Sequence, residues 1–390
     1  MEFALNDEQR ALQDAVRAYL RDRFGPAQVR ALYDDPAADG VPEALWRSMG
    51  EQGWLAVLVP EEHDGVGLGL LDASVLARAF GAGTVPGPWL GTVLTGEAVR
   101  LAGSKEQQGA LLPRLAAGEV KGAVALLASG SATTPPATAR ASTLTGDLGL
   151  VEYAAVADTL VVAAGSDDGV ALYLVDPSAS GVTIVGHDVL DRTTRLATVV
   201  LDGAAGEKLD NGTDAFQGLL DRAAVLVASD LVGIARKALT DTVEYDKTRV
   251  QFGKPVGSFQ AIKHDLADLH VAVTMAEHAA TYAAYAIDVE DDGRELAASI
   301  AKAKAGDVAN TAVSAMIQYH GGIGYTWEHD AHFYFKRSKR LEYTFGDAVQ
   351  HRERIARLVV DRAAAASQLP GTNPGGSAGV QGTGVAAGVA

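Results

Sequence analysis

The sequence contains no cysteine, which excludes disulfide bonds, thiolate metal sites and cysteine nucleophiles. Basic residues are also scarce: 33 Lys and Arg stand against 49 Asp and Glu, so the formal net charge is −16. Because phosphate binding needs a local excess of cations, this balance argues against a nucleic-acid partner. A local basic cluster nevertheless remains at Lys336–Arg340.

Long apolar runs are absent as well. The run Ala223–Ala228 ends at Ser229-Asp230 and is far too short to cross a bilayer. The first 24 residues are charged and follow a helical period, unlike a secretion signal. These features predict a protein without a membrane segment, and we expect it in the cytoplasm.

Three regions of different pattern follow one another. Residues 1–120 are helical in pattern: Asn6 and Gln9 predict a capping box, and an apolar stripe follows at Leu12, Val16, Tyr19 and Leu20. In residues 121–208, turn residues separate short runs rich in Val, Leu and Tyr, which predicts strands. These runs are Val124–Leu127, Thr159–Ala163, Val170–Val175, Val182–Val185 and Thr198–Leu201.

Helical patterns return in residues 209–365, where Val225, Val232 and Leu239 lie seven residues apart, as in a buried bundle helix. Residues 366–390 are mostly Gly, Ala, Pro, Ser and Thr, which predicts a disordered tail. The predicted fold is mostly α with a central β domain. It consists of an N-terminal helical domain, a middle antiparallel β-barrel and a C-terminal four-helix bundle.

General motifs indicate little chemistry. Gly65–Gly69 lacks the strand–helix context of a dinucleotide loop and predicts a turn. His329 and His332 share a helical face but have no third ligand, so we expect no metal site.

Two strings each place ligand-binding chemistry between helices. Residues 249–260, RVQFGKPVGSFQ, offer a guanidinium, a phenyl ring and an amide. Residues 318–325, QYHGGIGY, carry glycines that allow a backbone to approach an anionic ligand. An ordinary interhelical turn would explain either string alone, but not both together as easily.

These strings, with Gly53-Trp54, Pro60-Glu61 and Leu112-Pro113, resemble the acyl-CoA dehydrogenase family from Leu5 to about Arg362. The resemblance implies that both strings bind the diphosphate and adenine of an FAD whose flavin ring lies in a neighbouring subunit. By this resemblance the FAD-binding residues are Arg249, Phe252, Gln260, Gln318, Gly321 and Gly322.

Family members remove an α-proton from an acyl-CoA with a carboxylate. The resemblance places Phe345 at the usual glutamate position, and a phenyl ring cannot accept a proton. Some relatives carry the base earlier, which makes Asp221 the first candidate base here and Arg222 a candidate substrate-binding residue. Asp221 equally suits a capping role near a helix start. Glu342 is a more distant candidate for the base.

The family strings that hold the flavin ring have no match. The corresponding stretches are Ala125–Ser131 and Leu150–Ala155, which lack the usual hydroxyl, amide and indole groups. The resemblance therefore implies a subunit of a mixed α2β2 acyl-CoA dehydrogenase, as in bacterial steroid side-chain degradation, which completes an FAD site with a catalytic homologue. Two alternatives remain: a homotetramer using Asp221 as base, and a non-catalytic scaffold of the same fold. The family implies an electron-transfer flavoprotein as electron acceptor.

Overall fold

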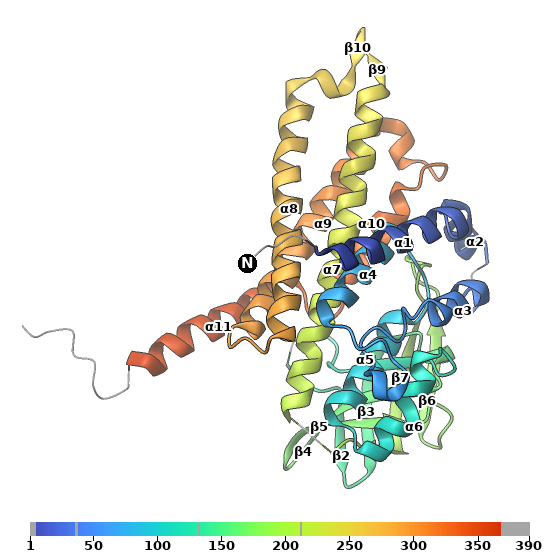
Figure 1. Cartoon of the computed structure of the whole chain (residues 1–390), viewed down its shortest axis with the longest axis vertical. Coiled ribbons are helices and arrows are strands. Elements are labelled where there is room, and N and C mark those ends of the chain that lie inside the picture. The colour runs from blue at the N-terminus through green and yellow to red at the C-terminus, as the bar shows by residue number, and fades with distance from the viewer. Residues whose placement is uncertain (1–4, 36–37, 132, 211–212, 368–390) are drawn as a thin grey trace, which may run out of the picture.

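The computed structural model describes residues 5–35, 38–131, 133–210 and 213–367, arranged as a β-sheet at one end and a long helical bundle at the other (Figure 1). Most of the predicted tail, residues 368–390, lies outside the described residues. Within the described part of the chain, no helix is long and apolar enough to cross a membrane.

The N-terminal region is helical, as predicted. The predicted capping box is present at the start of its first helix: Gln9 N donates to Asn6 Oδ1 over 2.8 Å, and Asn6 N donates to Gln9 Oε1 over 3.1 Å. Val16 and Leu20 of the predicted stripe are buried, because they face the helices that follow. The helices are α1 (Asp7–Arg23), α2 (Pro26–Asp34), α3 (Glu43–Glu51), α4 (Leu70–Ala82), α5 (Trp89–Ala102) and α6 (Lys105–Ala116).

The central region forms an eight-stranded sheet in the order β6-β7-β3-β2-β4-β5-β8, with β1 paired to β4. The sheet is mixed rather than wholly antiparallel, since β1 and β2 both run parallel to β4. The strands are β1 (Gly122–Ala125), β2 (Ala137–Arg140), β3 (Thr143–Glu152), β4 (Thr159–Ser166), β5 (Gly169–Val175), β6 (Val182–His187), β7 (Leu196–Ala205) and β8 (Glu207–Lys208).

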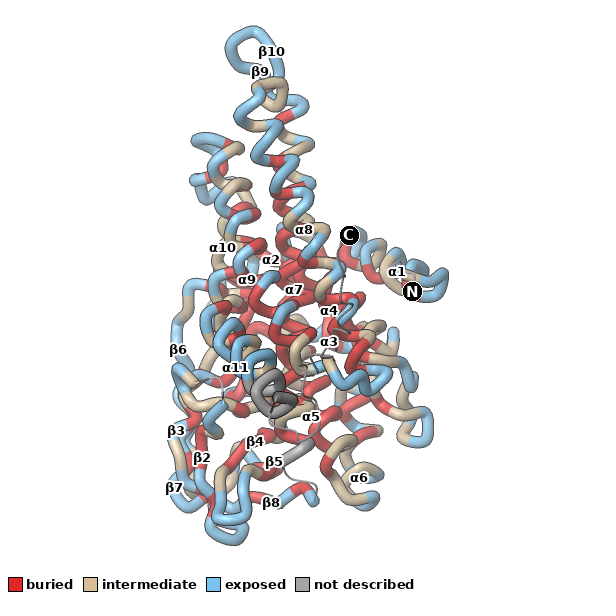
Figure 2. Tube along the Cα trace, turned by 90° about the vertical axis from the view of Figure 1, so that its left-hand side faces the viewer, coloured by how far each residue is buried: buried red, intermediate tan, exposed pale blue. Residues whose placement is uncertain are grey.

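Strand β4 joins the sheet to the helices, because residues on both of its faces are buried. Val161 and Ala163 belong to the core shared with the helices, whereas Leu160, Val162 and Ala164 pack inside the sheet. The alternation of side chains along a strand explains this division. The sheet is therefore fixed against the helical body (Figure 2).

The C-terminal bundle is built on α7 (Thr213–Thr248), whose predicted seam of Val225, Val232 and Leu239 is buried. The hairpin of β9 (Val250–Gln251) and β10 (Lys254–Pro255) connects α7 to α8 and projects from the far end of the bundle (Figures 1 and 2). The remaining helices are α8 (Gln260–Asp288), α9 (Arg294–Tyr319), α10 (Ala331–Tyr343) and α11 (Ala348–Ser367).

Candidate functional site

The two strings that predict a dinucleotide site lie toward the same end of the bundle, where helices next to the first string contact the second. The Tyr245 ring, on the last turns of α7 before Arg249, stacks on His320 with centroids 4.4 Å apart. The Tyr319 hydroxyl donates to Asp265 on α8, which ties the second string to the helix that follows the first. Sequence reasoning missed these supporting residues, because only the fold brings their helices together.

Both strings depend on left-handed backbone. Gly253 has a φ of 79° and Gly321 a φ of 63°, conformations that glycine adopts without strain. A β-carbon added at Gly321 or Gly322 would meet no atom of this chain within 4 Å. The glycines therefore leave open backbone for a ligand or a second chain.

The candidate FAD-binding side chains are exposed and available. The Phe252 ring is 91% exposed at the tip of the hairpin. In the described part of the chain, Arg249, Gln260 and Gln318 donate no side-chain hydrogen bond and form no ion pair. A guanidinium and two amides without internal partners are suited to an external anionic, hydrogen-bonding ligand.

A separate pocket of about 540 Å³ lies between the sheet and the helices. Segments from Ala125–Ser131, Leu150–Glu152 and Phe345–Gly346 all line it. By the resemblance, these are the stretches expected at the flavin-ring strings and the catalytic turn of the family. The fold thus brings together three segments that are far apart in the sequence.

The lining of this pocket differs from the hydroxyl, amide and indole groups expected of a flavin-ring site in the family. Its walls are largely aliphatic, with Leu126, Leu148 and Leu150 among them. The hydroxyl of Ser131 already accepts hydrogen bonds from the Thr133 and Thr134 amides of its own loop, over 3.2 and 2.9 Å. A flavin ring needs polar partners along its edge, which the side chains of these leucines cannot supply.

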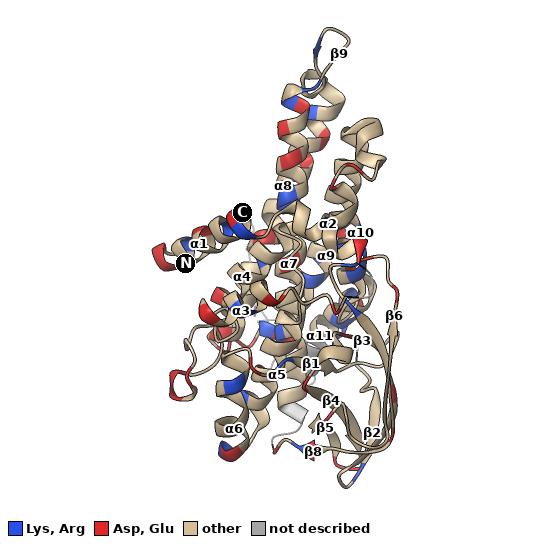
Figure 3. Cartoon of the chain, turned by 90° about the vertical axis from the view of Figure 1, so that its right-hand side faces the viewer, with Lys and Arg blue, Asp and Glu red and all other residues tan. Residues whose placement is uncertain are grey.

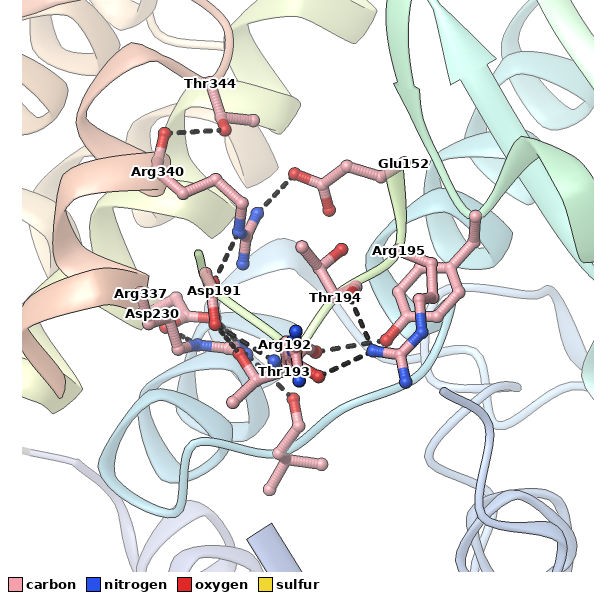
Figure 4. A network of polar contacts seen from close by, with 12 residues as sticks. Glu152, Asp191, Arg192, Thr193, Thr194, Arg195, Asp230, Arg337, Arg340 and Thr344 are labelled. Carbon is pink, nitrogen blue, oxygen red and sulfur yellow. Dashed lines mark hydrogen bonds and ion pairs between the residues drawn. The ribbon is translucent and has the colours of Figure 1, made fainter. Parts of the chain in front are cut away.

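A network around two arginines of α10 lies beside the pocket, and its Arg340 and Glu152 contribute to the pocket lining (Figure 4). Arg340 donates to Glu152 at the end of β3 and, over 2.8 Å, to Asp191. Arg337 donates to Asp230 on α7 over 2.5 Å and to the Val85 carbonyl over 3.0 Å. The network therefore joins the sheet, the bundle and the N-terminal region beside the pocket.

This burial corrects one sequence-based expectation. The basic cluster Lys336–Arg340 does not form an exposed cationic patch, because Arg337 and Arg340 point inward to carboxylates. Figure 4 shows both side chains among Glu152, Asp191 and Asp230, and Figure 3 shows basic and acidic residues interspersed over the molecule.

The candidate base Asp221 lies in a different environment from the one expected. Helix α7 begins at Thr213, so Asp221 lies about two turns inside the helix and cannot cap it. Its side chain is buried, and Arg354 on α11 donates to its Oδ1 over 2.6 Å. Burial raises the pKa of Asp221, and the Arg354 guanidinium opposes that shift. Asp221 does not line the 540 Å³ pocket, so this placement gives the proposed base no support.

The other two candidates are likewise engaged within the chain. Arg222 donates to Glu97 Oε2 over 2.8 Å and to the Gly218 carbonyl over 3.1 Å. The Glu342 carboxylate accepts from Lys339 over 3.4 Å, one turn away on the surface of α10. Neither residue lines the pocket.

We expect Asp221→Asn to destabilise the fold without changing flavin reduction by an assembled enzyme. Removing one partner of a buried ion pair costs about 3–5 kcal/mol, because Arg354 loses its nearer carboxylate at 2.6 Å and keeps only Glu295 at 3.7 Å. Denaturant unfolding and substrate-induced flavin bleaching measure the two effects. Asp241→Asn, which removes the half-exposed pair with Lys237, is the control and should cost less than about 1 kcal/mol. Bleaching lost in a folded Asp221→Asn protein would establish Asp221 as the base.

The two histidines considered for a metal do not converge. His332 stacks on Trp327 with centroids 4.4 Å apart, while the ring of His329 lies against His320. Burial and the nearby Lys336 lower the pKa of His332 to about 4, so it is neutral near pH 7. In the described residues, no group of three or more His, Asp or Glu is arranged to hold a metal ion.

Comparison with known proteins gives consistent matches along the chain. Residues 6–119 match the model of the acyl-CoA dehydrogenase N-terminal domain, and residues 210–360 match that of the C-terminal domain. Acyl-CoA dehydrogenase IpdE2 of Mycobacterium tuberculosis is 35% identical over 335 residues, which cover 85% of this chain and 91% of that protein.

Two solved structures show the same fold at full length. The Tcur3481-Tcur3483 steroid ACAD G363A variant has a TM-score of 0.85 and 30% identity, covering 92% of this chain and 99% of that chain. The ChsE4-ChsE5 complex from Mycobacterium tuberculosis has a TM-score of 0.83 and 28% identity, covering 93% and 99%.

Proposed function

Because the chain belongs to the acyl-CoA dehydrogenase family, we propose that it is one subunit type of a mixed α2β2 acyl-CoA dehydrogenase. In this proposal it supplies the adenine–diphosphate end of an FAD site, and a homologous subunit supplies the flavin-ring contacts and the catalytic base. The observation that carries the proposal is the contrast between the two regions. At the bundle tip, Arg249, Gln260 and Gln318 are exposed and have no side-chain partner in the described chain, whereas much of the lining of the 540 Å³ pocket is aliphatic.

The distance between the regions supports sharing of one cofactor between chains. Asp230 on α7 belongs to the arginine network beside the pocket, and Arg249 follows 19 residues later. At about 1.5 Å per helical residue, roughly 28 Å separates these two points. A dinucleotide held at the bundle tip therefore extends toward another subunit rather than back along the same chain.

When bound, FAD accepts the β-hydrogen of the acyl-CoA as hydride. In this chain Arg249 would bind the diphosphate, Phe252 would cover a ring face, and Gln260 and Gln318 would bind polar edges. The backbone at Gly321 and Gly322 would approach the anionic linker. Phe345 contributes only an apolar wall, since it has no proton acceptor.

We further propose a steroid side-chain CoA thioester as the substrate, which the similar steroid ACAD supports at the level of a steroid, and an electron-transfer flavoprotein as the electron acceptor, which the family resemblance implies. One similar structure is described as a steroid ACAD with two named components, and another as a complex of ChsE4 and ChsE5. A heteromeric assembly matches a subunit that has only one half of the cofactor site.

The proposal is tested by the ratio of flavin to protein. The chain purified alone should contain little FAD, because no subunit offers ring contacts. Co-expressed with a homologue that carries a glutamate at the position of Phe345, it should give a yellow complex with one FAD for each pair of unlike subunits. Absorbance of the purified complex measures this ratio.

The alternatives give different outcomes. Stoichiometric FAD in the chain alone, with turnover, would favour the homotetramer that uses Asp221. The scaffold alternative predicts no flavin under either condition. The present proposal is wrong if either result is found.

A further inference from the structure

A lysine is buried inside the helical bundle beside the pocket. The side chain of Lys302 on α9 is 1% exposed, and its ammonium donates to two backbone carbonyls, Glu342 O over 2.9 Å and Gly346 O over 2.6 Å. In the described part of the chain, the ammonium forms no ion pair with a carboxylate side chain.

The Gly346 carbonyl belongs to the turn that carries Phe345 into the pocket wall, and the Glu342 carbonyl lies at the end of α10 just before that turn. This turn connects α10 to α11, and its residues Tyr343–Asp347 all line the pocket. Phe345 has a φ of 56°, in the left-handed region that side chains with a β-carbon rarely adopt. Such backbone persists only where surrounding contacts fix it.

Other side chains hold the same turn from α11. The ring of His351 contacts the Phe345 carbonyl through Nε2 over 3.1 Å. Gln350 accepts from the Asp347 amide over 3.1 Å and donates to the Gly130 carbonyl over 2.9 Å, across the rim of the pocket. Lys302 is the member of this set that carries a full charge into the protein interior.

We propose that Lys302 is a positioning residue: its ammonium holds the left-handed Phe345–Gly346 turn and thereby sets the pocket wall, in a manner that depends on its protonation. The proposal goes beyond the assignment of this chain to an FAD-sharing complex. It concerns the position at which other members of the family carry their catalytic carboxylate.

A purely structural role explains Lys302 poorly, because a buried charge without an ion-pair partner is unfavourable even when it is hydrogen-bonded. Methionine would fill a similar volume without desolvating a charge. Burial lowers the pKa of Lys302 to about 7, although Asp347 and Glu342 favour the charged form through space. An ammonium is retained here at the expense of stability, as is common where a protein positions a functional segment.

Among Lys302 and the charged groups around the turn, Lys302 is the one whose pKa lies near neutral pH. Burial and the Lys302 charge lower the pKa of His351 to about 4, so its ring is neutral at pH 7. Arg354 on α11 is paired with Asp221 of α7 over 2.6 Å. Asp347 caps α11 by accepting from the Gln350 amide over 2.8 Å.

Raising the pH has two opposite effects in this arrangement. The folded pKa of about 7 lies below the ordinary value of 10.5, so between these values the unfolded chain binds a proton that the folded chain has lost. The free energy of unfolding therefore rises with pH. The unfolding constant falls by up to about tenfold per pH unit. The turn, however, loses charge-assisted hydrogen bonds, which are roughly twice as strong as neutral ones, and loosens. If the ammonium did not hold the turn, only the global stability would change with the titration of Lys302.

The experiment uses the full chain with Phe345→Trp as a reporter of the turn, with the unsubstituted chain as the spectral reference. As the pH rises, the emission of the introduced indole should report a loosening of the turn, with a midpoint near pH 7. Over the same range the unfolding constant should fall, because global stability rises. Adding Lys302→Met should abolish the emission shift. It should also remove the contribution of Lys302 to the pH dependence of the unfolding constant.

A second substitution covers the possibility that Lys302→Met does not fold. Glu342→Gln removes a half-buried carboxylate that raises the pKa of Lys302, so it should move the midpoint to lower pH. Asp72→Asn, far from the turn in α4, is the control and should leave the midpoint unchanged. An emission profile that is the same with and without Lys302, or a midpoint unmoved by Glu342→Gln, overturns the proposal.

Discussion

Replacing Arg340 by Met is expected to lower the free energy of unfolding by about 3–5 kcal/mol, the range found when one partner of a buried ion pair is removed. The guanidinium is shared between Glu152 at the end of β3 and Asp191 in the loop before β7. Without Arg340, the carboxylate of Asp191, a residue that is only 4% exposed, loses its ion-pair partner. The substitution therefore leaves charge in the interior, in addition to losing the hydrogen bonds.

A matched control separates this effect from loss of a surface pair. Arg10→Met removes the exposed pair with Asp7 on α1 and should change the free energy of unfolding by less than about 1 kcal/mol. Denaturant unfolding measures both variants. Equal and small effects would show that the network around Arg340 contributes no more than a solvated ion pair.

The pH dependence gives the same prediction a second readout. Burial raises the pKa of Asp191, but Arg340 and Arg337 outweigh it and hold this pKa below its ordinary value of 3.8. The stability that Asp191 contributes is therefore complete above about pH 4 and is lost as the pH falls further. In Arg340→Met this loss of stability in acid should be smaller, because the carboxylate no longer has its main cationic partner.

The second large effect is expected at the bundle tip. In the complex with its catalytic homologue, Arg249→Ala should weaken FAD binding by roughly 100-fold, since a charged hydrogen bond to phosphate contributes up to about 3 kcal/mol. Arg249→Lys should retain part of the affinity, because an ammonium lacks the two-pronged geometry of a guanidinium. Titration of the apo complex with FAD, followed by flavin fluorescence, measures both.

The fold should not change in these variants, because Arg249 is exposed and has no side-chain partner in the described chain. Lys247→Ala is the control: this lysine lies on the same turn of α7 and pairs with Glu244 on the surface. It should leave FAD affinity unchanged. If Arg249→Ala binds FAD like the parent, the string at residues 249–260 is not the diphosphate site.

Local sequence patterns predicted the order of helices and strands because the spacing of apolar residues reflects which side chains are buried. The capping box at Asn6, the stripe through Val16 and the seam through Val232 each required only side-chain periodicity. Strand β3 was missed, since Gly146 and Gly149 interrupt its pattern. The glycine at 146 is needed because a β-carbon there would lie 2.5 Å from the Pro136 carbonyl oxygen. That close approach exists only in the folded sheet.

Partners distant in the sequence were not predictable from local patterns. The parallel pairing of β1 and β2 with β4 depends on chain crossings that a strand signal does not contain. Arg340 was expected in an exposed basic cluster, because nothing nearby in the sequence shows that Asp191 and Glu152 meet it. The role of the strings at Arg249 and Gln318 came from resemblance alone and remains a prediction.

Helix α7 sets the distance between the two ends of the molecule. Its 36 residues set a length of roughly 54 Å and fix the angle at which the hairpin leaves the bundle. Insertion of one residue between Asp230 and Arg249 would advance the tip by about 1.5 Å and turn it by about 100°. Point substitutions on the solvent face of α7 are therefore compatible with a shared cofactor, whereas single-residue insertions and deletions in it are not.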